Sequence, residues 1–188
     1  MINELLLNKY GKYTDHALQV RNYALMVFDA MNNNIFYLTD KEKNYLTTAS
    51  LLHDIGYRID SKSHHKHSMQ MIMDMEIEEY TETEKQIVAN IARYHRGALP
   101  DITKHELYAK LSSENRTKVN ILASILRLAD GMDKPHKNLI TKIEASQNEK
   151  EIIFSLKTLG FKLNLEMTEA KKELMEKTFN KKVTFTCK

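Results

Sequence analysis

Hydrophobic positions recur along this chain with two different periods. From residue 1 to about 137 they return every three to four residues, which is typical of α-helices with one apolar face, and from about 138 onward they alternate with polar positions. The first region therefore predicts a series of helices. Their approximate bounds are 2–9, from 14 or 15 to 31, from 39 or 40 to 55, from 64 or 65 through 75, from 81–84 through 91, 104–111 and 114–132.

The second region predicts a small β-sheet. Four alternating stretches are typical of strands, and one has a helical pattern: strands over 139–145, 152–157, 161–166 and 182–186, and a helix over 168–179. We expect a mainly α fold in which a helical bundle is followed by a small antiparallel β-sheet with one covering helix. Pro135 falls where the helical pattern ends, so we divide the chain into a helical domain over 1–137 and an α+β subdomain over 138–188.

Composition narrows the classes of partner. The chain has 188 residues, 42% of them hydrophobic, and a net charge of +3, which suits a small anionic substrate but not the dense basic face of a specific DNA-binding protein. The single cysteine, Cys187, excludes an internal disulfide framework and favours a reducing, cytoplasmic setting. No stretch approaches the roughly 18 uninterrupted apolar residues that a membrane span needs. We therefore expect no membrane partner.

The pair His53-Asp54 is predicted to lie in the last turn of the 39–55 helix, just before Gly56, whose backbone freedom would end such a helix. Both side chains are common metal ligands. Neighbours on a helix point about 100° apart, so one metal rarely takes both unless other helices supply further ligands. Other predicted helices offer such ligands on or beside their apolar stripes: His16, His67, His95 and Asp130.

Each of these placements has a plain structural explanation when taken alone. His67 lies four residues before Met71, and a single inward histidine is more often a hydrogen-bonded core residue than a ligand. Six groups of metal-binding type on the inward faces of five helices are a different case, because burial without partners is costly for each of them. The set therefore predicts a metal site inside a helical bundle. These ligand types do not choose among manganese, iron, zinc, cobalt, nickel and magnesium.

One or two divalent ions would fit this set. One ion would be satisfied by four groups, namely His16, His53, Asp54 and Asp130. Adding His67 and His95 allows a second ion, with Asp54 placed to bridge the two.

Cations cluster near the predicted ligands. Guanidinium and ammonium groups beside a metal suit phosphate oxygens, so we predict four substrate-binding residues: Lys66, Arg93, Arg96 and Arg127. The other neighbours have plainer interpretations. Asp133 could orient a water, but capping or surface solvation explains it as well, and Lys134 is interpreted as a solvated charge. His64 and His65 could approach the mouth of the site, although exposed loop histidines are commoner, and His105 and His136 are interpreted as surface residues.

The order His16, His53-Asp54 and Asp130 resembles the HD superfamily of metal-dependent phosphohydrolases. Within it, four stretches resemble the C-terminal part of the exopolyphosphatase/guanosine pentaphosphate phosphatase (Ppx/GppA) family: 52–56, 65–68, 93–96 and 126–133. The terminal strand-strand-helix-strand piece is also similar to the end of those proteins. In that family the polyphosphate-cleaving site resides in an N-terminal actin-like module, whose glycine-rich phosphate loops have no counterpart in these 188 residues.

The resemblance implies an HD-type phosphohydrolase with one or two divalent metal ions, acting on a nucleotide or another small phosphate ester or anhydride. Asp54, Arg96 and Arg127 are its expected catalytic residues, and an activated water would attack in line. Two alternatives stay open. The chain could be a non-catalytic module that binds polyphosphate or a nucleotide and partners a separate exopolyphosphatase. It could also be a purely structural homodimer joined through exposed strands of the sheet.

Overall fold

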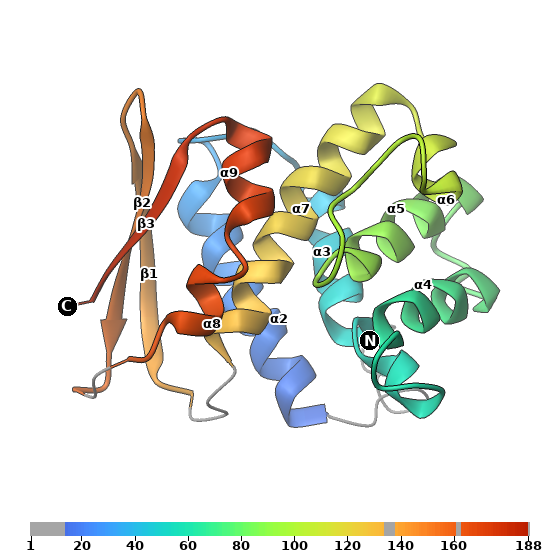
Figure 1. Cartoon of the computed structure of the whole chain (residues 1–188), viewed down its shortest axis with the longest axis horizontal. Helices are drawn as coiled ribbons and strands as arrows, with labels where there is room; N and C mark the ends of the chain where they lie inside the picture. The colour runs from blue at the N-terminus through green and yellow to red at the C-terminus, as the bar shows by residue number, and fades with distance from the viewer. Residues whose placement is uncertain (1–13, 134–137, 161–162, 188) are drawn as a thin grey trace.

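The computed structural model describes residues 14–133, 138–160 and 163–187, and its architecture is mainly helical, as the apolar pattern predicts. The helix predicted over 2–9 lies outside the described residues. Among the described helices, α7 runs through the middle of the molecule (Figure 1). The helices of the first region are α2 (Thr14–Met31), α3 (Asp40–Leu52), α4 (His64–Asp74), α5 (Glu82–Arg93), α6 (Glu106–Ala109) and α7 (Ser113–Met132), with the short 3₁₀ helix η1 (Ile55–Arg58) after α3.

Two of these helices begin at capping boxes. The Thr39 side chain accepts from the Lys41 N–H at the start of α3, and Glu42 closes the box onto the Thr39 backbone. At α5, Thr81 Oγ1 accepts from the Glu84 N–H (3.3 Å), and the Glu84 carboxylate accepts from the Thr81 N–H (2.7 Å). Such caps satisfy main-chain donors that have no partner within the helix. The predicted starts of both helices are confirmed.

The C-terminal region forms a three-stranded sheet in the order β1-β2-β3, with β1 at Ile140–Gln147, β2 at Glu151–Thr158 and β3 at Lys182–Cys187. β1 pairs antiparallel with β2, so that Ala145 lies opposite Phe154, but β3 runs parallel to β2, with Phe185 opposite Phe154. The sheet is therefore mixed rather than purely antiparallel. The reason is its connection, because two helices, α8 (Glu166–Glu169) and α9 (Glu173–Phe179), carry the chain from β2 back to the start of β3.

Two details of that region differ from the sequence prediction. The strand predicted over 161–166 does not form, because 163–165 have no regular structure and Glu166 begins α8, while 161–162 lie outside the described residues. The alternation there has another cause: Leu163 is buried and Leu165 packs against the core from a loop. The helix predicted over 168–179 is divided into α8 and α9 by a turn at Ala170.

The hydrophobic core is continuous from the helical region into the sheet. Val20 and Phe28 on α2 belong to the same buried cluster as Phe154 and Leu156 on β2. α9 packs on α7, and β1 packs on α2 (Figure 1). The proposed division at residue 137 falls in 134–137, outside the described residues. None of the described helices is both long and apolar enough to span a membrane.

Gly56 is needed for close packing rather than for a left-handed backbone. α3 ends at Leu52, three residues earlier than predicted, and Gly56 lies within η1 against α4. A side-chain carbon at Gly56 would lie 2.1 Å from the carbonyl oxygen of His64 and 2.6 Å from the backbone nitrogen of Ser68. The missing side chain therefore lets α4 approach the end of α3.

Candidate metal centre

His53 and Asp54 point into one centre because the chain leaves helical geometry between them. His53 still has helical backbone angles at the C-cap of α3, whereas Asp54 has φ −107° and ψ 3°. This turn brings the Nε2 atom of His53 to 3.4 Å from an oxygen of Asp54. Adjacent residues that would diverge on a regular helix can therefore serve the same site.

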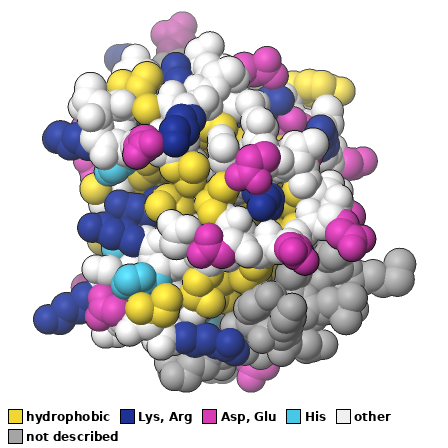
Figure 2. Space-filling model, turned by 90° about the vertical axis from the view of Figure 1, so that its right-hand side faces the viewer, with side chains coloured by type: hydrophobic (Ala, Val, Ile, Leu, Met, Phe, Trp, Pro, Cys, Tyr) yellow, Lys and Arg dark blue, Asp and Glu magenta, His cyan; other side chains and the backbone are white. Residues whose placement is uncertain are grey.

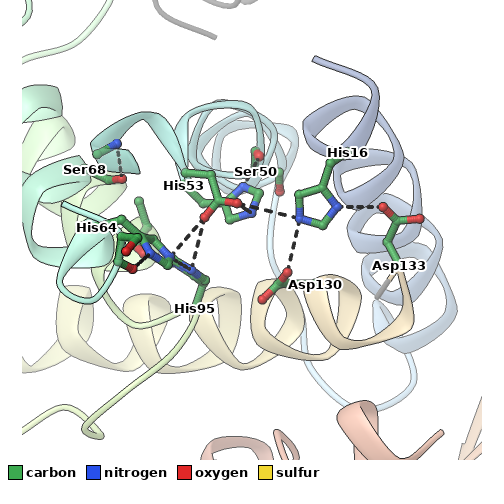
Figure 3. Close-up of polar contacts among 12 residues, drawn as sticks. His16, Ser50, His53, His64, Ser68, His95, Asp130 and Asp133 are labelled. Carbon is green, nitrogen blue, oxygen red and sulfur yellow. Dashed lines mark hydrogen bonds and ion pairs between the residues drawn. The ribbon is translucent and has the colours of Figure 1, made fainter. Parts of the chain in front are cut away.

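Asp54 is the centre of the cluster, and its two oxygens face different histidines. Figure 3 shows the rings of His16, His53, His64 and His95 that surround it. Oδ1 lies 3.2 Å from His64 Nε2 and 3.5 Å from His95 Nε2. Oδ2 lies 3.4 Å from His53 Nε2 and 3.8 Å from His16 Nε2. One carboxylate therefore stands between two groups of imidazoles, as a bridging ligand would.

Asp130 brings α7 into the same centre. Its Oδ1 atom lies 3.3 Å from His16 Nε2, and its Oδ2 atom contacts the ammonium group of Lys171. Two sets of three ligand atoms lie close enough together for an ion: His16, His53 and Asp130 in one, and His53, Asp54 and His95 in the other. The sequence-predicted set of His16, His53, Asp54, His95 and Asp130 therefore converges in space from α2, the end of α3, the end of α5 and α7.

Three of the histidine rings are oriented by the same kind of hydrogen bond to the main chain. In each ring Nδ1 lies 2.7 Å from the main-chain carbonyl oxygen three residues earlier: His53 to Ser50, His64 to Ser61 and His95 to Ala92. A carbonyl oxygen only accepts hydrogen bonds, so each Nδ1 must carry the proton. When such a ring is neutral its lone pair is therefore on Nε2, the atom that faces Asp54 in all three. This is the arrangement of histidine ligands held by a second hydrogen bond.

The resulting lone pairs need a cation or a proton between them. Nε2 of His64 and Nε2 of His95 are 3.2 Å apart, and both of these rings are buried. The buried Nε2 of His53 has no hydrogen-bond partner among the described residues. Two acceptor atoms facing each other at this distance repel unless something positive lies between them. Imidazole nitrogens and carboxylate oxygens are suitable ligands for divalent transition metals, so these residues fit such an ion.

The two carboxylates are held in their charged form. Burial alone would raise the pKa of Asp54, but the neighbouring His53 outweighs it and holds the pKa of this carboxyl well below its usual range. For Asp130, burial is outweighed by the hydrogen bond with His16 and the charge of Lys171, and the pKa is again well below the usual range. Both groups are therefore anionic at neutral pH, as metal ligands must be.

The imidazoles of His16 and His95 are held in different protonation states. Burial opposes protonation of His16, but its hydrogen bonds with Asp130 and Asp133 outweigh it and raise its pKa to about 9. Burial and the charge of His53 lower the pKa of His95 well below its usual value, so that ring is neutral at neutral pH. A protonated His16 thus supplies part of the positive charge that the carboxylates attract.

A cavity of about 300 Å³ opens onto this centre and has cationic walls. Arg96, Arg127 and Lys171 all line it. Arg127 is buried, and its two terminal nitrogens donate to the carbonyl oxygens of Tyr94 (3.2 Å) and Gly97 (3.0 Å). Its guanidinium is therefore fixed in place beside the cluster. An anion that enters this cavity meets three positive side chains beside the candidate metal ligands.

Two of the predicted substrate-binding residues do not line this cavity. Lys66 and Arg93 line a separate cavity between α4, α5 and α6. For Arg93 the reason is its place at the end of α5, where the chain changes direction. Arg93 is the last residue of α5, and the chain turns at Tyr94 so that His95 and Arg96 reach the metal centre while Arg93 does not.

His67, a predicted ligand, is also outside the cluster, and His64 stands there instead. The buried residues of α4 are His64, His65, Ser68 and Ile72, and three of them (His64, Ser68 and Ile72) lie four residues apart, whereas Met71 is only half-buried. The sequence prediction placed His67 four residues before Met71 and so chose the wrong stripe. Taking Ile72 as the inward residue would have selected His64, so the signal was present in the sequence.

Two further residues of the site were underestimated or missed. Asp133 is buried rather than solvated, and its Oδ2 atom lies 2.6 Å from Nδ1 of His16, so it orients this ring as the carbonyl groups orient the others. Lys171 comes from the turn between α8 and α9 and contacts Asp130. No local pattern around Lys171 indicates this role, because only the packing of α8 on α7 brings it to the site.

Comparison with known proteins places the chain in a family. The family model for Ppx/GppA phosphatase, domain III, matches residues 3–178. The guanosine-5'-triphosphate,3'-diphosphate pyrophosphatase of Vibrio campbellii is 24% identical over 119 residues, which are 63% of this chain and 24% of that protein. The protein of the same name from Pseudoalteromonas atlantica is 24% identical over 144 residues, 75% of this chain and 28% of its own.

The chain spans about a quarter of the length of these relatives. The family match itself covers nearly the whole chain. From the cluster of ligand-type side chains and the extent of this match, we conclude that the chain belongs to the Ppx/GppA phosphatase family, in the part described as domain III.

Proposed function

We propose that this protein is an HD-type, divalent-metal-dependent phosphohydrolase that acts on a nucleotide or another small phosphate ester or anhydride. The observation that carries the proposal is the common orientation of His53, His64 and His95, whose Nδ1 atoms are bound to main-chain carbonyl groups and whose Nε2 atoms face Asp54. Such an arrangement uses buried polar groups that contribute little to folding on their own.

In this proposal Asp54 would help to hold both ions. His16, His53 and Asp130 would hold the first with Asp54, and His64 and His95 would hold the second. Bound divalent ions supply Lewis acidity and activate water for attack on phosphorus. The ligand set alone does not select the metal, and manganese, iron, zinc, cobalt, nickel and magnesium all remain candidates.

The other residues of the cavity would bind and orient the substrate. Arg127 is fixed by two main-chain carbonyl groups, so its guanidinium can receive phosphoryl oxygens without being reordered. Arg96 and Lys171 add positive charge around the same space, which offsets the charge that develops on the phosphoryl group. Asp133 keeps Nε2 of His16 directed at the cluster.

The names of the relatives support the substrate class. Both are named as pyrophosphatases of guanosine-5'-triphosphate,3'-diphosphate. A pyrophosphatase breaks a phosphoanhydride bond. A nucleotide anhydride is therefore the first substrate to test.

The proposal is tested by metal analysis and a substrate screen on the same preparations. The protein is purified in the presence of manganese, its metal content is measured, and phosphate esters and nucleotide anhydrides are screened. We expect retained metal and metal-dependent turnover, with both lost in Asp54→Ala. His64→Ala and His67→Ala form a matched pair three residues apart on α4, and only His64→Ala should lose metal. Equal activity in the unmodified protein and in Asp54→Ala would refute the proposal.

A non-catalytic binding module is the second candidate, and Lys171 is the observation that favours it. Its ammonium group already contacts one oxygen of Asp130, which neutralises part of the charge that would attract an ion. This alternative predicts that a nucleotide or polyphosphate binds with the same affinity in the presence and absence of metal and is recovered unchanged. Metal-dependent turnover would exclude it.

A further inference from the structure

A second cavity, of about 660 Å³, lies between α4, α5 and the segment 104–110 that contains α6. It shares no lining residue with the cavity at the metal centre. Figure 2 views the side of the molecule that α4, α5 and α6 form, where hydrophobic side chains gather in the middle and Lys and Arg side chains collect toward one edge. A cavity of this size is large enough for a small organic ligand.

The lining of this cavity is strongly cationic. It contains one described carboxylate, that of Glu106, and four permanently positive side chains: Lys66, Arg93, Lys104 and Lys110. Lys104 forms an ion pair with Asp101, just before this segment, and Lys110 forms one with Glu106 within it. Neither Lys66 nor Arg93 forms an ion pair with a carboxylate of the described residues. Two unneutralised cations therefore face one cavity, one from α4 and one from α5.

Arg93 is the unusual one, because its side chain is only 7% exposed. Its Nη1 atom is buried and has no hydrogen-bond partner within the described part of the chain. The guanidinium carbon lies 5.5 Å from the centre of the Tyr94 ring, which offsets only part of the charge. A buried guanidinium with an unused donor is costly for the folded protein, and an anion in the adjacent cavity would offset that cost.

The rest of the lining is apolar or aromatic. Met69 and Met73 on α4 and Leu107 on α6 are half-buried and border the cavity, and Tyr108 forms part of its floor. His105, expected at the surface, is half-buried here, and its Nδ1 atom lies 2.9 Å from the Tyr94 hydroxyl group. Methionine-rich walls adapt to flat apolar groups. The cavity therefore combines a cationic side with an apolar one.

We propose that this cavity is a second ligand site, distinct from the metal centre, which binds a nucleoside phosphate. The phosphate groups would lie against Lys66 and Arg93, and the base would lie against Met69, Met73 and Leu107. Arginine and lysine together suit a multiply charged phosphate better than a single carboxylate. This proposal does not depend on catalysis at the candidate metal centre, because the two cavities share no lining residue.

The test is calorimetric titration of the whole chain with ADP, followed by the same titration of variants. Arg93→Gln should weaken ADP binding by roughly 10- to 100-fold, which is the range for a lost hydrogen bond to a charged group. Lys66→Gln, at an exposed position that folding does not need, should weaken it several-fold. Lys62→Gln is the matched control, because Lys62 is an exposed lysine close to α4 that does not line the cavity. It should leave binding unchanged.

Three further arms define the site. Asp54→Ala should retain ADP binding, and loss of all binding in that variant would place ADP at the metal centre and overturn the proposal. Inorganic pyrophosphate and adenosine should each bind at least tenfold more weakly than ADP. Equal affinity for either would refute a site that binds both the phosphate groups and the base. Circular dichroism shows whether Arg93→Gln folds, and if it does not, Lys66→Gln decides alone. ADP affinity unchanged in Lys66→Gln would then contradict the proposal.

Discussion

Gly56 offers the sharpest test of how the packing of α4 supports the metal centre. Replacing it by alanine adds one carbon at the place where α4 meets the end of α3. That carbon would lie 2.1 Å from the carbonyl oxygen of His64, 2.6 Å from the backbone nitrogen of Ser68 and 2.8 Å from Cβ of His67. Two of these three atoms belong to the backbone, so no side-chain rotation can relieve the clash.

The size of the effect follows from these distances. Contacts of this kind are not found below 3.0 Å, so α4 would have to withdraw by about 0.9 Å at the His64 carbonyl. The movement also strains the hydrogen bond from the Gly56 N–H to the Ser68 hydroxyl group, which is 2.9 Å long and buried. We expect Gly56→Ala to lower the free energy of unfolding by about 3 kcal/mol. Because His64 moves with α4, bound metal should also decrease.

Urea unfolding followed by circular dichroism measures this change. With a slope of about 2 kcal/mol per molar urea, the midpoint should fall by about 1.5 M. Gly160→Ala is the control, because Gly160 has φ +82° but no neighbouring atom of the described residues lies within 4 Å of an added carbon. It should show only the backbone cost of roughly 1 kcal/mol. A midpoint for Gly56→Ala within 0.2 M of the unmodified protein would show that α4 does not pack as described.

Three further changes test other parts of the argument. Lys171→Met removes the ammonium group that contacts Asp130; we expect turnover to fall by about 10- to 100-fold with metal content unchanged, and unchanged turnover would exclude a role in substrate binding. Glu84→Gln keeps the capping box with Thr81 but removes the charge. Because the pKa of Glu84 is lowered to about 2, chiefly by its hydrogen bond with a lysine, its charge stabilises the fold above the usual carboxyl pKa near 4.3, and that contribution is lost as pH falls toward 2. The stability difference between the two proteins, measured by urea unfolding, should therefore shrink between about pH 4.5 and pH 2, whereas a constant difference would contradict this account. Phe154→Ala empties a fully buried position in β2 and should cost about 3–5 kcal/mol in urea unfolding; a cost below about 1 kcal/mol would mean that the sheet is not part of the common core.

Local features of the fold could be predicted with good accuracy. Thr39 and Thr81 begin helices because a threonine followed three residues later by glutamate satisfies free main-chain groups locally. The alternation around Phe154 likewise predicts a half-buried strand from local sequence, because side chains alternate between the two faces of any single strand. The direction of β3 is different, because a strand has the same pattern in either orientation.

The membership of the metal centre was predictable only in part. Buried histidines and acids at helical spacing are costly unless they share a function, so His16, His53, Asp54, His95 and Asp130 could be grouped before any geometry was known. His64 and His67 are three residues apart on one helix, and their burial depends on how α4 is rotated. A short helix with apolar residues on more than one side does not determine that rotation.

The chain's own pattern thus determined that the first region is helical, where α3 and α5 begin, and three of the four predicted strands. These properties depend on contacts within a few residues. Tertiary structure alone decided that His64 faces Asp54, that Lys171 reaches Asp130, and that Lys66 and Arg93 belong to a different cavity. Such choices depend on how whole helices pack against one another, and a shift of one residue on a helix turns a side chain by about 100° toward another neighbour.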